Sequence, residues 1–308
     1  MTNPPKRPAL YENVCLHEDL TRSLNCDDAW ARAFTFAVGD DSPELSAAAG
    51  PNRLAPSAGI ARDLMVLFLE GYDTTDTAGL HQRQDIWYHR PVRVGETLTL
   101  RGRYVEKYER RGKGYVVFES EALNAAGHVV VSQRCTEVMS IPPGIKTATG
   151  TAHAPSRKIE GIWPDGVRTV AAPSMVTSLP APLPLTVKNL DQNAMSVFSG
   201  VATHRRNIHN SLEKAQKFGF DRCVAAGMME ACWLSEMAAR YFGVEFLWRG
   251  HVSAVFLSPI FAGDVVTCRG VVMEETRSED AARMHHLEFW CENGDGQRTA
   301  VGTAACPV

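Results

Sequence analysis

The fold is decided by a short segment that occurs twice in the chain, PVRVGE at residues 91–96 and PIFAGD at residues 259–264. The second copy begins 168 residues after the first (259 minus 91). Both copies are followed by an Arg-Gly pair, Arg101-Gly102 and Arg269-Gly270, again 168 residues apart (269 minus 101). A constant offset indicates an internal repeat, which has to be recognised before any fold is assigned.

Two further landmarks occur in the same order. The same offset pairs Ser57-Ala58-Gly59 with Ala225-Ala226-Gly227, and each triplet opens a long apolar segment. The distance from this glycine to the glycine of the repeated motif is 36 residues in both halves (95 minus 59, and 263 minus 227). Downstream, NAAG at 124–127 matches NGDG at 293–296. We therefore predict the duplication and fusion of one unit.

Each half has the pattern of a buried helix followed by strands. The helix expected at residues 228–241 is apolar on most sides, which is typical of an enclosed helix, and its counterpart is expected at residues 60–72. Alternating or β-type runs separated by Gly and Asn turns predict strands. These are expected at 84–89, 97–108, 115–124, 128–139, 253–257, 265–274, 285–292 and 298–305. One helix followed by an antiparallel meander indicates the α+β class.

Composition divides the chain into three parts. We expect an N-terminal unit at residues 1–145 and a C-terminal unit at residues 185–308. Residues 146–184 are rich in Pro, Ala, Thr, Ser and Gly and are expected to be a linker. Because a structureless loop of this length is uncommon in a compact protein, part of the linker is expected to pack across the surface.

The overall composition is that of an ordinary globular protein, with 44% hydrophobic residues, 22% charged residues and a net charge of −3. Without a basic excess, nucleic acid and anionic membranes are poor candidate partners. No apolar run has the length needed to span a bilayer. The eight cysteines are scattered without a C-x-x-C pair, which argues against a metal site and favours reduced thiols in a cytoplasmic protein.

The C-terminal half carries the most specific motif. His209 is followed by Gly219-Phe220 and then by Gly227-Met228 at the start of the predicted helix. This order resembles the MaoC-like family, which includes R-specific enoyl-CoA hydratases and acyl dehydratases and has the signature G-D-x-N-P-x-H, then G-F, then A-H-G-M. The resemblance covers most of both halves and is strongest over residues 198–270. It implies a tandem double hot-dog, in which each half is a long helix wrapped by a curved antiparallel sheet.

The match departs from the signature where the family has its catalytic aspartate. That position, five residues before His209, is His204. The asparagine position is Arg206, with Asn207 one place late, and the second signature histidine is Ala226. Some branches of the family are similar in lacking the aspartate, including mitochondrial 3-hydroxyacyl-thioester dehydratases. The departure weakens the hydratase interpretation without removing it.

The N-terminal half contains GDDSPEL at residues 39–45, which resembles a worn copy of the same signature. Asp40 keeps the aspartate position, whereas Leu45 replaces the histidine. Neither half has the complete pair, and we expect the chemistry in the C-terminal half.

The resemblance implies addition or removal of water at the 2,3-bond of an acyl thioester such as an acyl-CoA. His209 suits the general base and acid, because histidine titrates near neutral pH. Gly227 suits an oxyanion hole, because the N–H groups at a helix N-terminus are free and glycine lets the thioester carbonyl approach. The groups that could replace the aspartate are His204, Arg206, Asn207 or a carboxylate from elsewhere, such as Asp191.

Several neighbours are candidates for binding substrate. Arg205 and Arg206 could hold a CoA phosphate or a substrate carboxylate with two hydrogen bonds, the alternative being a solvated charge pair. Ala226 and Met228 flank Gly227 and are expected to contact the substrate. No metal or redox cofactor is expected, and the resemblance suggests a homodimer.

Three other functions stay open. A hot-dog thioesterase would need a carboxylate on the buried helix, which Glu230 or Glu236 could provide. The missing aspartate favours a catalytically inactive acyl-binding subunit. The third open function is a lyase for an unusual substrate, in which a signature loop altered like this one is expected. An open pocket facing His209 would favour an enzyme, and a filled pocket would favour the inactive subunit.

Overall fold

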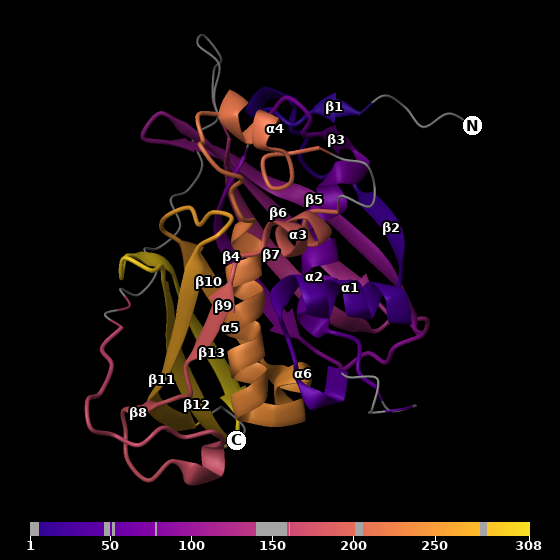
Figure 1. Ribbon diagram of the computed structural model, residues 1–308. Helices are drawn as coiled ribbons and strands as arrows, with labels where there is room; N and C mark the ends of the chain where they lie inside the picture. Colours follow the sequence, from indigo (N-terminus) through magenta and orange to yellow (C-terminus); the bar gives the residue numbers. More distant parts are fainter. Residues whose placement is uncertain are drawn as a thin grey trace.

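The computed structural model describes residues 6–45, 50, 53–77, 79–139, 159, 161–200, 206–277 and 282–308. These residues form one large antiparallel sheet with the long helices packed against one of its faces (Figure 1). The predicted α+β class is confirmed.

Strands from both halves join in a single sheet. Its order is β2-β5-β6-β7-β4-β10-β13-β12-β11-β8, and β9 also pairs with β11. The bounds are β2 Leu20–Asn25, β5 Thr97–Arg110, β6 Lys113–Leu123, β7 Val129–Met139, β4 Leu80–Tyr88, β10 His251–Phe256, β13 Arg298–Pro307, β12 Arg283–Glu292, β11 Val265–Arg277, β8 Ala181–Pro182 and β9 Thr186–Asn189. All eight predicted strands are present. The halves meet where β4 pairs antiparallel with β10.

The strands follow from alternation and from turn glycines. Along the first part of β5, exposed and buried residues alternate from Thr97 to Tyr104, which is the pattern of a strand with one face on the core. The hairpins between β6 and β7 and between β12 and β13 turn at Gly127 (φ 77°) and Gly296 (φ 75°). Only glycine adopts this left-handed backbone readily, which explains why the repeat keeps a glycine at both turns.

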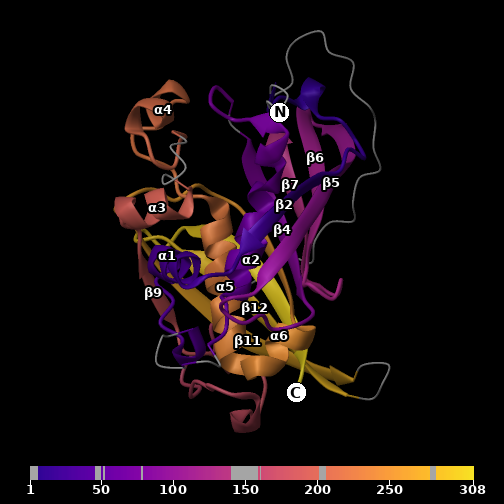
Figure 2. The ribbon, with the colours of Figure 1, turned by 90° about the vertical axis from the view of Figure 1, so that its right-hand side faces the viewer.

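The long helix of the C-terminal half, α5, spans Gly227–Phe242 and is buried on nearly all sides, as predicted. It ends at Gly243, whose φ of 70° stops the helix. Its neighbour α2 (Ser57–Met65) lies beside it on the same face of the sheet (Figures 1 and 2). The two helices thus form the shared centre of the fold.

The N-terminal helix is shorter than the predicted range of residues 60–72. After α2 the chain tightens into a 3-10 helix over Val66–Glu70 and then enters the short strand β3 (Tyr72–Asp73). Strand β3 pairs in parallel with β1 (Arg7–Pro8), so its backbone hydrogen bonds go to another strand. This tertiary pairing overrides the helical periodicity of the segment.

Before its long helix, each half has a strand and a helix that were not predicted from the sequence. In the N-terminal half these are β2 and α1 (Asp28–Val38), and in the C-terminal half they are β9 and α3 (Gln192–Phe198). Two short helices complete the C-terminal half, α4 (Leu212–Lys217) and α6 (Phe246–Arg249). The paired elements add to the evidence for a duplicated unit.

Part of the predicted linker packs against the C-terminal half. Strand β8 pairs with β11, and the Gly161 carbonyl accepts a hydrogen bond from Arg298 at 2.9 Å. The Trp163 ring meets Trp290 edge-on, with 6.3 Å between ring centroids. These contacts agree with the expected packing, and the boundaries of the two units stay a prediction.

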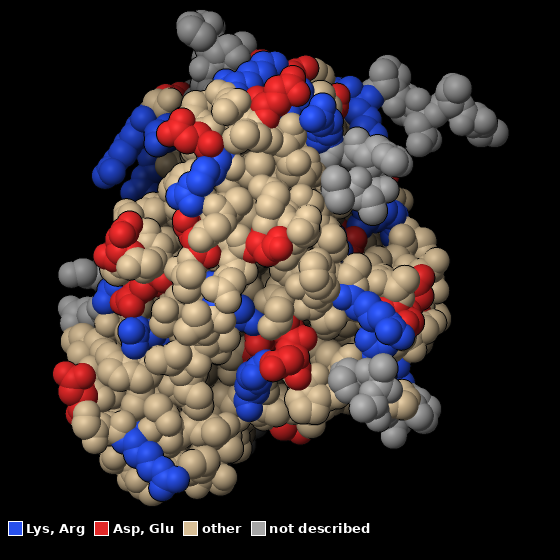
Figure 3. Space-filling view, in the orientation of Figure 1, with Lys and Arg blue, Asp and Glu red and all other residues tan. Residues whose placement is uncertain are grey.

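The molecular surface carries both signs of charge. Basic and acidic side chains are interspersed over the face drawn in Figure 3, with large uncharged areas between them. Within the described ranges, no helix combines the length and the apolar character needed to cross a membrane. All eight cysteines are free thiols, and Cys15 is the exposed one.

Candidate active site

A cavity of about 370 Å³ lies where the two halves meet, at the N-terminal end of α5. Its C-terminal walls come from the loop before α4, the start of α5 and the end of β10. Its N-terminal walls come from α2, the segment after it, and strands β4 and β7. Its lining residues include Asn207, His209, Gly227, Glu230, Thr77, His81 and Glu137.

His209 lines this cavity, and its Nδ1 atom lies 2.7 Å from the carbonyl oxygen of Val224. A carbonyl only accepts hydrogen bonds, so Nδ1 carries the hydrogen and Nε2 keeps its lone pair. Among the described residues Nε2 has no hydrogen-bond partner. Burial lowers the pKa of His209, against a smaller raising effect of the Val224 hydrogen bond. The ring is therefore neutral at neutral pH and suited to accept a proton.

The loop that presents His209 is fixed by its own hydrogen bonds. The Asn207 side-chain oxygen accepts from the His209 N–H at 2.9 Å, and Asn210 Oδ1 accepts from the Asn207 N–H at 3.0 Å. From α3, Gln192 Nε2 donates to the His209 carbonyl at 3.0 Å. Asn207 thus lies in the cavity wall and holds the loop in shape, and the catalytic role expected for it stays a prediction.

Gly227 opens α5 beside the histidine loop. Ala226 is the N-cap residue and no side chain caps this helix end. Within the described part of the chain, the Gly227 N–H has no hydrogen-bond partner. A Cβ atom at this position would lie 3.2 Å from carbons of the Phe256 ring. The glycine therefore keeps space beside a free, positively polarised amide.

Two carboxyl groups also line the cavity. Glu230, one turn into α5, accepts a hydrogen bond from Thr299 Oγ1 at 2.6 Å, and burial raises its pKa to about 8. The side chain of Glu137 on β7 makes no ion pair or hydrogen bond to a described residue, and burial raises its pKa to about 7. From the sequence, Glu230 was a candidate for a thioesterase only, and Glu137 was missed because no motif marks it.

Other predicted residues lie outside the cavity wall. Arg206 is exposed and its Nη1 lies 3.6 Å from Glu213. Met228 is fully buried in the core. Asp191 caps α3 by accepting from the Asn193 N–H at 2.7 Å, so it does not supply the missing carboxylate. His204 and Arg205 lie outside the described residues, and the roles expected for them stay predictions.

A second cavity, of about 420 Å³, lies at the matching place of the N-terminal half, at the start of α2, and α5 forms its other wall. It is lined by Asp40 and Leu45 of the worn signature and by Ser57 and Ala58 at the start of α2. Leu45 stands where the other half has His209, so this cavity lacks the imidazole base.

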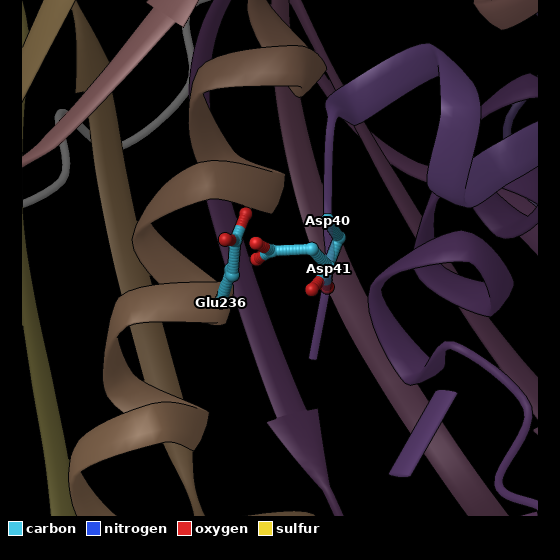
Figure 4. A group of neighbouring side chains, drawn as sticks. All are labelled: Asp40, Asp41 and Glu236. Atoms are coloured by element: carbon cyan, nitrogen blue, oxygen red, sulfur yellow. The ribbon is translucent and has the colours of Figure 1, made fainter. Parts of the chain in front are cut away.

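Glu236 of α5 belongs to that second cavity and faces Asp40 and Asp41 (Figure 4). Its Oε2 accepts from Lys188 Nζ at 2.7 Å, and Arg240 lies 2.8 Å from its Oε1. Burial raises the pKa of Glu236 to about 7, with Asp40 adding to the rise and Lys188 opposing it. Its charge is thus compensated by basic side chains, and it lies in a different cavity from His209.

No protein-family model matches the sequence. No curated protein matches it either. Solved structures do match. A MaoC-like dehydratase covers 97% of this chain and 99% of its own, with a TM-score of 0.71 and 17% identity. A putative MaoC domain dehydratase from Chloroflexus aurantiacus J-10-fl covers 99% and 98%, with a TM-score of 0.70 and 13% identity.

A Mycobacterium tuberculosis protein described as having a double hot-dog fold covers 97% of this chain and 98% of its own. Its TM-score is 0.66 at 12% identity. These likenesses confirm the predicted double hot-dog fold and, for the fold, the predicted resemblance to MaoC-like proteins. At 12 to 17% identity the likeness is one of fold.

Proposed function

We propose that this protein is a hydratase or dehydratase that adds or removes water at the 2,3-bond of an acyl thioester, such as an acyl-CoA. The observation that carries the proposal is the shared cavity of His209 and Gly227: a neutral imidazole with a free Nε2 beside a free helix-terminal amide. Because this cavity is open, it supports an enzyme over an inactive subunit.

In the direction of hydration, Nε2 of His209 accepts a proton from water while the water oxygen bonds to Cβ of the enoyl thioester. The electron pair of the double bond moves toward the thioester, whose oxygen becomes negative. The Gly227 N–H stabilises that oxygen, because a fixed donor in a buried site needs no reorganisation. Dehydration follows the same steps in reverse.

The α-carbon then needs a proton, and Glu230 is our candidate for the group that replaces the signature aspartate. It lines the cavity one turn after Gly227, and its raised pKa of about 8 keeps it largely protonated at neutral pH. The acid gives its proton to the α-carbon, and the proton taken up by His209 returns to the Glu230 carboxylate through water. The solved structures named MaoC-like dehydratases agree with this class of reaction, at low identity.

Glu230 also favours a second candidate function, thioester hydrolysis. In that reaction the carboxylate would activate water for attack on the thioester carbonyl, which the Gly227 amide would polarise. A neutral Glu230 is poorly suited to this task at pH 7, so we rank it second.

One assay separates the two functions. The purified protein is mixed with straight, branched and hydroxylated 2-enoyl-CoA esters, while the conjugated thioester absorbance and the free thiol are followed together. Loss of absorbance without free thiol is the expected result. Release of free CoA would establish the thioesterase, and an absence of both signals across the panel would contradict the proposal. A homodimer and a cytoplasmic location stay predictions.

A further inference from the structure

A bulge in strand β4 turns His81 toward the cavity. From Gln84 to Tyr88 the even-numbered residues Gln84, Ile86 and Tyr88 are buried on the inner face. An unbroken strand would place the odd-numbered His81 on the outer face. The pairing with β7 shifts between His81 and Arg83, which inserts one residue, and His81 lines the cavity instead.

Glu137 meets His81 on the same wall. The two residues are direct partners across the β4–β7 ladder. Directly opposite residues of antiparallel strands place their side chains side by side on one face of the sheet. Both side chains line the cavity, and so does Thr77, four residues before His81. The N-terminal half therefore contributes a polar patch of His81, Glu137 and Thr77 to a cavity whose proposed chemistry lies in the other half.

The patch contains buried polar atoms without partners. Nδ1 of His81 and Oγ1 of Thr77 are shielded from solvent, and neither makes a hydrogen bond of normal geometry to a described residue. Nε2 of His81 pairs with the side-chain amide of Gln84 at 3.0 Å, which leaves Nδ1 as the ring nitrogen for a ligand. Buried polar groups are rarely left unpaired, so this patch is built to meet a polar group of a ligand.

The patch lies close to the proposed oxyanion hole. The His81 ring packs on Phe256 with 4.5 Å between centroids, and Phe256 borders Gly227. When the carbonyl oxygen of a thioester lies at the Gly227 amide, only the ring of Phe256 therefore separates that amide from His81. Because the CoA nucleotide has to stay outside a cavity of this size, the shielded patch suits the enclosed acyl end of the ligand.

We infer, on the basis of the proposed function, that the acyl group of the substrate carries a hydroxyl that binds to His81, Glu137 and Thr77. A hydroxyl donates one hydrogen bond and accepts others, so it can pair with His81 Nδ1 in either tautomer and with Thr77 or Glu137 as well. A plain alkyl chain leaves all three groups unpaired, which costs binding free energy.

A carboxylate fits this patch less well than a hydroxyl. It would face Glu137, and two close carboxylates repel each other unless one is protonated. Among the described lining residues Arg62 is the one Arg or Lys. Its Nη2 lies 3.1 Å from Asp63 and its Nη1 donates to the Phe198 carbonyl at 3.2 Å, whereas Nε is buried without a partner among the described residues. The one cation among the described residues of this wall is thus already paired with a carboxylate, and Glu137 would repel a second one.

Unreactive ligands test this inference separately from catalysis. S-(hydroxyalkyl)-CoA thioethers and S-alkyl-CoA thioethers of the same heavy-atom count are titrated into the full-length protein by calorimetry, over a series of chain lengths. At the length that reaches the patch, the hydroxyl ligand is expected to bind about five- to tenfold more tightly than its methyl counterpart. Equal affinity at every length, or preference for the methyl ligand, overturns the inference.

Variants locate the effect. Glu137→Leu and His81→Phe are each expected to abolish the preference, whereas Gln82→Leu, at a neighbouring position outside the cavity lining, should keep it. If the patch variants weaken both ligands equally, the patch meets the pantetheine arm and the inference is wrong. A preference unchanged in both variants also overturns it. Should one variant fail to fold, the wild-type comparison and the other variant still decide.

Since the thioethers cannot react, a hydroxyl preference in a protein without hydratase activity would contradict the proposed function alone.

Discussion

Nδ1 of His209 lies 2.7 Å from the carbonyl oxygen of Val224, three residues before the glycine that opens α5. One backbone segment thus fixes the tautomer of the proposed base and, immediately afterwards, presents the free amide of Gly227. The fold itself therefore fixes the position of His209 relative to the Gly227 amide, and a flexible loop is not the only link between them.

Gly227→Ala tests the oxyanion hole. A Cβ atom here would lie 3.2 Å from the Phe256 ring, tighter than an ordinary contact, and would occupy space beside the amide. We expect kcat/KM for hydration to fall by about tenfold or more, the loss typical of a weakened oxyanion donor, with a small change in Tm. The control is Gly294→Ala, where an added Cβ meets nothing within 4 Å. Full activity in Gly227→Ala would argue against the assignment.

The pH profile of kcat/KM reports the proposed base. Because burial lowers the pKa of His209, its neutral form persists to lower pH than an ordinary histidine. We expect the acid limb of the profile, where activity is lost as pH falls, to lie below about 6.5, the ordinary value. An acid limb at or above that value would contradict a buried neutral His209.

The variant Glu230→Gln tests whether Glu230 is a neutral acid at neutral pH, and the free energy of unfolding is the quantity measured. Burial raises the pKa of Glu230 from 4.5 to about 8, so the folded protein holds this proton more tightly than the unfolded chain. The associated stability is fully present below about pH 4.5 and is lost as pH rises toward 8. Glutamine does not ionise, so the variant should gain relative to wild type across this window, by at most about 1.4 kcal/mol per pH unit. Denaturant unfolding at several pH values measures the gain. The matched control is Glu213→Gln, the same change at an exposed glutamate of α4.

Lys188→Met tests the buried pair of the N-terminal cavity. Lys188 and Glu236 are both buried and lie 2.7 Å apart, so the variant leaves Glu236 with Arg240 alone. We expect the free energy of unfolding to fall by about 3 kcal/mol at pH 8. The loss should shrink as pH falls toward 7, because Lys188 lowers the pKa of Glu236, so the variant takes up a proton on Glu236 at a higher pH than wild type, whose pKa is raised to about 7. Lys217→Met removes an exposed ion pair to Asp76 and should change stability little. A loss independent of pH would contradict the raised pKa.

The repeat made most of the fold predictable. Turn glycines such as Gly127 and Gly296, and the alternation in strands such as β5, are local features that a sequence displays directly. The strand and helix that open each half were missed, because β9 and α3 are short and depend on pairing with β11 and on the Asp191 cap. The pairing of β3 with β1 also makes the N-terminal helix shorter than the sequence predicted.

The candidate site was predictable only where a motif marks it. His209 and Gly227 could be named because they keep the spacing of a known signature. His81 and Glu137 come together through a strand bulge and a ladder register, and neither can be read from spacing. Their contribution to a cavity in the other half arises from the edge-to-edge joining of β4 and β10.

The most direct test of the account is the rate of 2-enoyl-CoA hydration by wild type, His209→Gln and the control His128→Gln, which changes an exposed turn histidine. The product is identified by its gain of one water in mass. We predict hydration by wild type and by His128→Gln, and a loss of about a hundredfold or more in His209→Gln, as expected for removal of a general base. Hydration at the wild-type rate in His209→Gln would contradict the central claim that His209 activates the water.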